Sequence, residues 1–203
     1  MSATKIRLSP KELELFTKDD WILTKNTILK KIEHFLGDVH VQQKKIIDEV
    51  QQQLPEEWVR SSAKISKGEY YKELPYRILD FPKVFTPKAI LAIRTMFWWG
   101  HYFSVTLHLS GAYKNQFTPS IQKAYPLLAR HHFFLCVNDD QWEHHFAEGN
   151  YKSIHQLSEK TFIDNMAQKD FCKIACRIPL QELDTTATFL LSQFKLIVEI
   201  VTD

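Results

Sequence analysis

The stretch that decides the fold is HYFSVTLHLS, residues 101–110. Its side chains alternate between two sets, and this period of two is typical of a β-strand. One set is largely apolar and the other polar, as expected for an antiparallel strand with helices against one face. The first set is His101, Phe103, Val105, Leu107 and Leu109, and the second is Tyr102, Ser104, Thr106, His108 and Ser110.

Three further stretches predict strands. PYRILDFP, residues 75–82, lies between two prolines, which favours an edge position because proline cannot donate a ladder hydrogen bond. RHHFFLCVND, residues 130–139, is apolar on both faces and is predicted to be central. FCKIACRI, residues 171–178, points its cysteines and isoleucines inward and Lys173 and Arg177 outward.

Helical periodicity dominates the N-terminal quarter. Ser9, Pro10 and Glu12 form a helix-opening signature for a short helix to about Phe16. Apolar residues at helical spacing predict a second helix that ends at Gly37, and a third from about residue 39 to 54.

The remaining helices are predicted downstream. TPKAILAIRTMFWW, residues 86–99, is apolar on every side and is predicted to be a buried helix that ends at Gly100. A short helix capped by Asp140 with Glu143, a helix over 154–166, and a closing helix capped by Asp184 follow. No periodicity is visible from residue 55 to 73, so this stretch is predicted to be irregular.

These elements predict an α+β fold with about four mainly antiparallel strands, helices on one face and an N-terminal three-helix layer. Residues 1–203 are expected to form a single globular domain, with 1–54 as the helical layer and 74–203 as the sheet and its packing helices. The closing helix and the 86–99 helix are expected to pack on Phe103, Val105 and Leu107.

Composition excludes several classes of protein. The 26 basic and 24 acidic residues nearly cancel and the sequence pI is about 8.3, so no nucleic-acid partner is expected. The start lacks the apolar core of a secretory signal, and no segment has the ~18 uninterrupted apolar residues of a membrane span. We therefore expect a cytoplasmic protein without a membrane partner.

The three cysteines are expected to be free. On an extended strand the Cα atoms of Cys172 and Cys176 lie about 13 Å apart, beyond the reach of a disulfide, although a helix would bring them together. An unpaired set fits a reducing compartment. Cys136, among apolar neighbours, is expected to be an inert core thiol.

Conventional cofactor motifs are missing from the sequence. The five glycines are widely spaced, which excludes the dinucleotide and P-loop fingerprints, and H-E-x-x-H, C-x-x-C and G-x-S-x-G do not occur. The pairs His131–His132 and His144–His145 resemble metal ligands, but adjacent side chains diverge on a strand or a helix. We therefore predict neither a metal nor a cofactor.

The candidate ligand site combines an irregular cationic loop, an aromatic helix end and a polar strand face. Arginine and lysine bind anions, and tyrosine and tryptophan offer flat apolar surfaces. Of the two adjacent tryptophans, one is expected in the core, and the other either lines a pocket with the polar strand face that begins at Tyr102 or is exposed at the helix end. The candidate residues are Lys64, Lys67, Gly68, Tyr71, Arg77, Trp98, Trp99, Tyr102, Thr106 and His108.

One block resembles a family of short uncharacterised bacterial cytosolic proteins. Its entry follows the pattern G-E-x-Y-K-x-L-P-Y, and L-D-[FY]-P and F-W-W-G come after it. The matching residues are Gly68, Glu69, Tyr71, Lys72, Leu74, Pro75 and Tyr76, then Leu79 to Pro82, then Phe97 to Gly100. The resemblance brings no activity, so it implies only a bacterial, cytosolic setting.

The first functional hypothesis is a non-catalytic binding or interaction domain for a small anionic ligand or a protein partner. The alternative is an enzyme that uses histidine and carboxylate as acid and base, either with or without a metal. A closed pocket that holds His108, Asp80 and Arg94 within mutual reach is the arrangement that a metal-free version requires. The catalytic residues and the oligomeric state stay undefined at this level.

Overall fold

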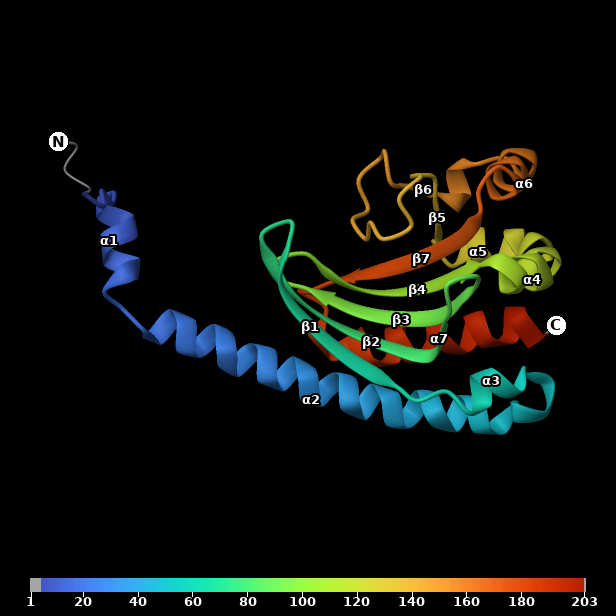
Figure 1. Cartoon of the computed structure of the whole chain (residues 1–203), viewed down its shortest axis with the longest axis horizontal. Coiled ribbons are helices and arrows are strands. Elements are labelled where there is room, and N and C mark those ends of the chain that lie inside the picture. The colour runs from blue at the N-terminus through green and yellow to red at the C-terminus, as the bar shows by residue number, and fades with distance from the viewer. Residues whose placement is uncertain (1–4, 203) are drawn as a thin grey trace.

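The computed structural model describes residues 5–202, so the ends of the expected 1–203 domain lie outside the described residues. Within that range seven strands form one antiparallel sheet in the order β1-β2-β3-β4-β7-β5-β6 (Figure 1). The strands are β1 (Lys64–Tyr71), β2 (Leu74–Phe85), β3 (Ile90–Trp98), β4 (Tyr102–Ser110), β5 (Phe134–Cys136), β6 (Tyr151–Ser153) and β7 (Phe171–Pro179).

Seven α-helices accompany the sheet in the described range. The two long helices, α2 and α7, lie side by side along one face of the sheet (Figure 1). The helices are α1 (Pro10–Phe16), α2 (Asp20–Glu49), α3 (Glu56–Val59), α4 (Gly111–Lys123), α5 (Tyr125–Arg130), α6 (Glu159–Ala167) and α7 (Leu183–Thr202). The α+β class is therefore confirmed, but the prediction of about four strands was too low.

The decisive stretch forms β4, as predicted, between β3 and β7. Phe103, Val105 and Leu107 are buried on the helix-covered face, where α7 packs. The prediction that the closing helix covers these residues is confirmed. The opposite face is buried as well, because residues 137–150 cover it in place of a helix.

The predicted helix over residues 86–99 was wrong, because this segment is strand β3. Its apolar residues on every side suit a strand that is buried on both faces as well as they suit a buried helix. The ladder partners decide between the two, since β3 pairs along its whole length with β4 and over most of it with β2.

The predicted irregular stretch 55–73 contains α3 and strand β1, and it therefore accounts for one missing strand. β1 is an edge strand with mostly exposed side chains, so it lacks the apolar alternation that marks a half-buried strand. β2 is consequently internal. The edge position that its prolines had suggested was wrong. Pro82 is accommodated at a register shift between Asp80 and Lys83.

The expected three-helix N-terminal layer is α1 plus one continuous helix, because Gly37 does not end α2. Glycine inside a helix costs about 1 kcal/mol relative to alanine. Leu36 and Val39 flank it and are both buried against the body of the protein. Their burial, at about 1.5–3 kcal/mol each, outweighs that cost.

The second half of the chain differs from prediction in four details. The stretch 130–139 gives only the short strand β5, next to the edge strand β6. Asp140 caps a turn through the Trp142 amide at 2.8 Å and opens no helix. The expected helix 154–166 divides into a 3₁₀ turn at Ile154–Gln156 and α6. The closing helix begins at Leu183, with Asp184 in its first turn.

By length and apolar composition alone, α7 passes the criteria for a membrane span. Half of its most apolar window is buried inside the protein. Core helices of folded domains pass the same criteria, and Leu190, Phe194 and Ile197 of α7 are fully buried.

Candidate functional site

The predicted ligand residues do not converge on one site. Trp99 lines a groove at the projecting end of α2, whereas Tyr71, Trp98 and Tyr102 pack together beneath residues 137–150. Thr106 and His108 are buried under the same segment. The predicted cationic residues divide further: Lys64 and Lys67 are exposed on edge strand β1, and Arg77 is buried on the helix-covered face.

Two of these residues have clear structural roles. The Arg77 Nε atom donates to Glu33 Oε1 of α2 at 2.7 Å, so its charge holds α2 to the sheet and does not face a ligand. Gly68 lies opposite Tyr76, and a Cβ at this position would sit 2.4 Å from the Tyr76 ring. Glycine is therefore needed for packing at this point of β1.

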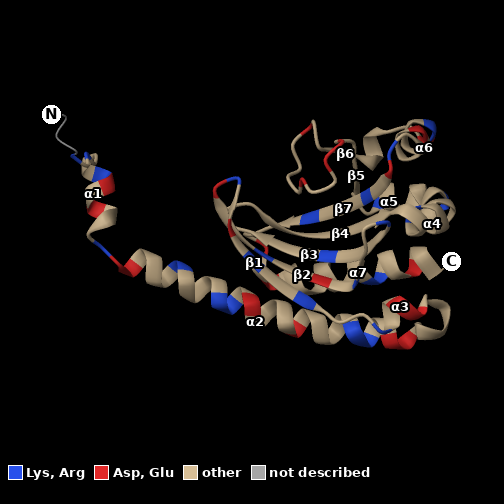
Figure 2. Cartoon of the chain, viewed as in Figure 1, with Lys and Arg blue, Asp and Glu red and all other residues tan. Residues whose placement is uncertain are grey.

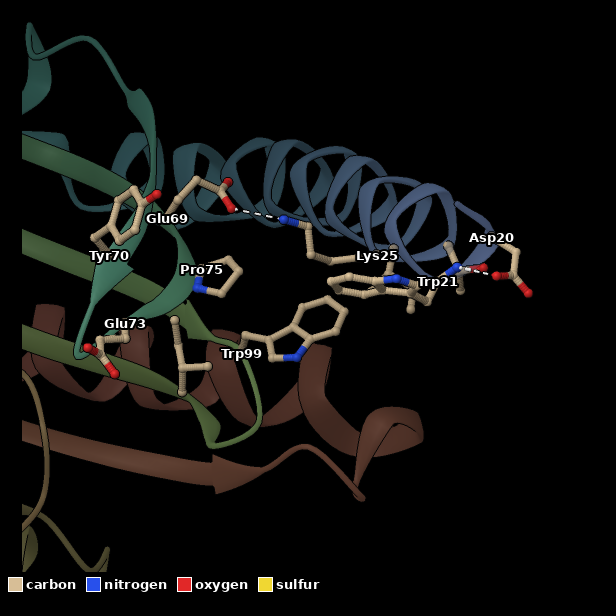
Figure 3. Close-up of a pocket in the computed structure, with 11 residues that line it drawn as sticks. Asp20, Trp21, Lys25, Glu69, Tyr70, Glu73, Pro75 and Trp99 are labelled. Atoms are coloured by element: carbon tan, nitrogen blue, oxygen red, sulfur yellow. Dashed lines mark hydrogen bonds and ion pairs between the residues drawn. The ribbon is translucent and has the colours of Figure 1, made fainter. Parts of the chain in front are cut away.

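The groove is a cavity of about 610 Å³ between the N-terminal half of α2 and the β1–β2 turn. In Figure 3 the indole rings of Trp21 and Trp99 lie beside each other, with Pro75 next to them. Ile28 and Leu74 complete the apolar surface. Of the two adjacent tryptophans, Trp98 is buried and Trp99 lines this groove, which lies beside α2 and not on the polar face of β4.

Charged side chains form the rim of the groove. Lys25 Nζ of α2 donates to Glu69 Oε2 of β1 at 3.2 Å, and this contact bridges the two walls (Figure 3). Asp20 and Glu73 add two further carboxylates. The groove is therefore apolar in the middle with a mixed, mainly acidic rim, which is unfavourable for a small anion and suits an apolar surface with polar edges.

The groove continues into a projecting segment, residues 10–28, which we call the arm. It extends beyond the sheet (Figure 1) and carries an unusual density of exposed large apolar side chains. Phe16 is the most exposed of them inside a helix, at 78%. The others are Leu13, Leu15, Trp21, Ile22, Leu23 and Ile28.

A second cluster lies on the other face of the sheet, beneath residues 137–150, which we call the covering loop. Arg94 donates to both carboxylate oxygens of Asp80, at 2.8 and 3.0 Å, and lies 3.0 Å from the Nε2 atom of His144. His108 is bonded to Gln141 at 2.9 Å. A small cavity of about 300 Å³ lies beside Asp80, Arg94 and His144.

Burial determines the protonation of this cluster. Burial, followed by the nearby Lys173 cation, lowers the pKa of His108 to about 3. Burial, followed by the Arg94 charge, holds the pKa of His144 well below its usual value. Both histidines are therefore neutral at physiological pH, so neither has the near-neutral pKa that favours acid–base catalysis.

The polar groups of the cluster hold the covering loop in place. Lys173 Nζ donates to the backbone oxygens of Gln141 and Glu143, at 2.8 and 2.6 Å. The Tyr71 hydroxyl donates to Glu143 Oε2 and accepts from the amides of His144 and His145. A metal-free enzyme would require His108, Asp80 and Arg94 within mutual reach in a closed pocket. This arrangement is met only in part, because Asp80 and Arg94 are paired with each other while His108 is bonded to Gln141 of the covering loop.

The two histidine pairs do not form a common site. His131 and His132 are exposed at the end of α5, whereas His144 and His145 belong to the covering loop. Among residues 5–202 there is no group of three or more histidine, cysteine or acidic side chains with the geometry of a metal site.

The cysteines are buried and unpaired, which confirms that Cys172 and Cys176 form no disulfide. Burial raises the pKa of the Cys172 thiol to about 12 and also raises that of Cys136. A buried thiol with a raised pKa carries almost no reactive thiolate.

Comparisons with known proteins give no functional assignment. The chain matches no protein-family model, no curated protein sequence and no solved structure.

Sequence reasoning missed most of the groove. It placed Trp21 and Ile28 among the apolar residues of an amphipathic helix and did not connect them with Trp99. The available signal was the spacing of Trp21, Thr24, Lys25 and Ile28, which mixes large apolar and polar residues on one helical face.

Proposed function

We propose that this chain is a non-catalytic interaction domain whose groove binds an amphipathic helical segment of a protein. The observation that carries this proposal is the apolar groove between Trp21, Ile28 and Trp99, continuous with the exposed apolar arm. Helix-in-groove recognition uses large apolar anchors at helical spacing on the ligand and an apolar cleft on the receptor.

The shape and composition of the groove support a helix as ligand. One wall is α2 and the other is the β1–β2 turn, so a third segment can lie against both. Tryptophans at the centre of an interface supply much of its binding energy, while charged rims contribute orientation more than affinity. The Lys25–Glu69 pair and the carboxylates of Asp20 and Glu73 are placed to orient the ligand.

A small anion is a poorer fit to the described residues. Arg77 and Arg94 are each paired to a carboxylate, and Lys173 donates to backbone oxygens of the covering loop. Lys64 and Lys67 point outward from an edge strand. The protein-partner form of the hypothesis is therefore the one that we propose.

The test uses a panel of synthetic helical peptides, ~15 residues long, with apolar residues at positions i, i+3, i+4 and i+7 and varied flanking charge. Binding is followed by tryptophan fluorescence and by calorimetry, because Trp21 and Trp99 line the groove. At least one peptide is expected to bind with a Kd on the order of 10 µM.

Two groove variants and one matched control give the test its specificity. Trp99→Ala and Ile28→Ser are each expected to weaken peptide binding about tenfold or more. Trp142→Ala alters an exposed tryptophan of the covering loop and should leave binding unchanged. Failure of the whole panel to bind, or binding that both groove variants leave intact, would contradict the proposal.

A further inference from the structure

A second cavity of about 610 Å³ lies on the face of the sheet that the covering loop occupies. Four segments meet around it: the β1–β2 turn at Lys72, the β3–β4 turn at His101, the covering loop at Phe146 and β7 at Arg177. Among residues 5–202 no acidic side chain lines this cavity, whereas three acidic side chains line the groove. The two cavities therefore suit ligands of different charge.

The cation that distinguishes this cavity is Arg177. Basic and acidic residues are interspersed along the chain (Figure 2), so an anion site has to be a local arrangement. Arg77 and Arg94 are each paired with a carboxylate, and Lys72 is paired with Glu143 at 3.3 Å. Arg177 is exposed and has neither a hydrogen-bond partner nor an ion-pair partner within the described part of the chain. Its charge is therefore available to a ligand.

Aromatic rings position the Arg177 guanidinium. Its central carbon lies 5.0 Å from the ring centre of Phe146, 5.4 Å from that of Tyr102 and 5.8 Å from that of Phe134. These distances are typical of cation–π contacts. The rings attract the charge but provide no oxygen acceptor, so the N–H donors remain available. Such a fork of donors matches the two oxygens of a carboxylate or a phosphate.

The β3–β4 turn gives the same cavity a flat surface. Gly100, with a φ of +74°, adopts the left-handed conformation that this tight turn requires. The ring of His101 then stacks on Trp98, with 3.6 Å between the ring centres and 13° between the planes. His101 is exposed, so the side of its ring away from Trp98 is accessible. A flat ring of a ligand can stack on this surface.

Hydrogen bonds hold the aromatic walls in place without a ligand. Trp98 Nε1 donates to the Tyr71 backbone oxygen at 3.2 Å, and the Tyr102 hydroxyl donates to the His144 backbone oxygen at 3.2 Å. A preformed cavity loses little conformational entropy when it binds a ligand. The walls are therefore ready for a rigid, planar molecule.

From these observations we infer that this cavity binds a small aromatic anion, a molecule that carries a carboxylate or phosphate group on a flat ring. Arg177 binds the anionic group, and the stack of His101 on Trp98 binds the ring. A volume of about 610 Å³ is within the range of small-molecule sites. The site is separate from the groove, so this inference goes beyond the proposed function and does not rest on it.

The experiment is isothermal titration calorimetry of the full chain with two probes. Indoleacetate is the aromatic carboxylate and adenosine monophosphate is the aromatic phosphate, and at least one is expected to bind with a Kd on the order of 100 µM. Indoleacetamide and adenosine lack the charge, and acetate and inorganic phosphate lack the ring. Each of these four is expected to bind about tenfold more weakly or worse, because it makes only half of the contacts.

Three variants locate the binding site. Arg177→Gln removes the charge and is expected to raise the Kd about tenfold. His101→Ala removes the exposed ring of the stack and is expected to raise the Kd about threefold. Both residues are exposed, so the fold should be retained, and thermal unfolding checks this. Arg130→Gln, at an exposed arginine that lines a different cavity, is the matched control and should leave the Kd unchanged.

Each contrary outcome overturns the inference in its own way. Failure of both aromatic acids to bind, or binding that Arg177→Gln leaves unchanged, removes the site. Equal binding of the neutral or the ring-free analogues shows that one of the two contacts is not made. Binding lost in Trp99→Ala but kept in Arg177→Gln assigns the probe to the groove. Helical peptides bind at the groove without Arg177, so the proposed function stands or fails on its own measurement.

Discussion

The two halves of α2 belong to one uninterrupted helix and have opposite environments. The half after Ile32 lies on the sheet and α7, and Leu36, Val39, Gln43 and Ile47 are buried. The part before Leu29 projects past the sheet (Figure 1), and Trp21, Ile22 and Leu23 are exposed. Both halves have apolar residues at helical spacing.

The difference between the halves shows what amphipathic periodicity predicts. It indicates that one face of a helix is apolar, but it does not identify the surface that covers this face. The packed half satisfies that need within the chain, as the Arg77–Glu33 contact and the core around Leu36 show. The projecting half does not, so its apolar surface is available to another molecule. We consequently expect substitutions in the packed half of α2 to lower the stability of the fold, and substitutions in the projecting half to affect binding.

The largest expected effect is in the core beneath the packed half. Phe194 of α7 is fully buried in the main apolar cluster. Truncation to alanine leaves a large cavity, and Phe194→Ala should lower the free energy of unfolding by about 3–5 kcal/mol. Urea denaturation measures this value, and a loss below ~1 kcal/mol would show that α7 does not anchor the core.

The same side chain in the two halves of α2 gives the sharpest contrast. Leu36 is fully buried and Leu23 is 57% exposed. Leu36→Ala should lower the free energy of unfolding by about 2–5 kcal/mol, and Leu23→Ala should change it by no more than about 0.5 kcal/mol.

This comparison must be made on the monomer. Thermal unfolding at the lowest protein concentration that gives a signal removes any contribution from association, since a dimer stabilises the chain by mass action. Similar losses for the two variants would mean that the projecting half packs onto the body of the protein.

A smaller effect is expected from pH, and it too belongs to the packed region. Burial lowers the pKa of His108 on the sheet to about 3, and it also lowers that of His40 in the packed half of α2. Below the ordinary histidine pKa of 6.5 the unfolded chain binds more protons than the folded one. Stability is therefore complete above about pH 6.5 and falls as the pH is lowered.

For His108 the expected loss is about 2 kcal/mol between pH 6.5 and about pH 5. His108→Gln should flatten this part of the stability profile even where it lowers stability overall. Chemical denaturation at several pH values provides the measurement, and an unchanged slope in the variant would assign the pH dependence to other groups.

The elements that could be predicted from the sequence are those that pack on the rest of the protein through one face. β4 has one apolar and one polar face, and the period of two identified it. The closing helix was identified in the same way from its apolar stripe. The segment 86–99 defeated the method because it is apolar on both faces as β3, and periodicity does not separate a doubly buried strand from a buried helix. β1 was missed for the opposite reason, since an exposed edge strand has no apolar face.

The candidate site was less accessible to sequence reasoning. The groove combines Trp99 with Trp21 and Pro75, which are distant from one another in the sequence. Arg77 looked like a free cation and is paired with Glu33 across 44 residues. Long-range pairing of this kind leaves no periodic signal.

The sequence by itself determined the α+β class, the strand at residues 102–110, the closing helix, the free cysteines and the absence of clustered-glycine phosphate motifs, because each depends on local chemistry or local periodicity. Only the tertiary structure decided that residues 90–98 form a strand, that a loop and not solvent covers the polar face of the sheet, and that α2 extends beyond the body of the protein. These features depend on which segments meet in space. The groove at Trp99 exists because a helix that is longer than its sheet leaves one end without a partner.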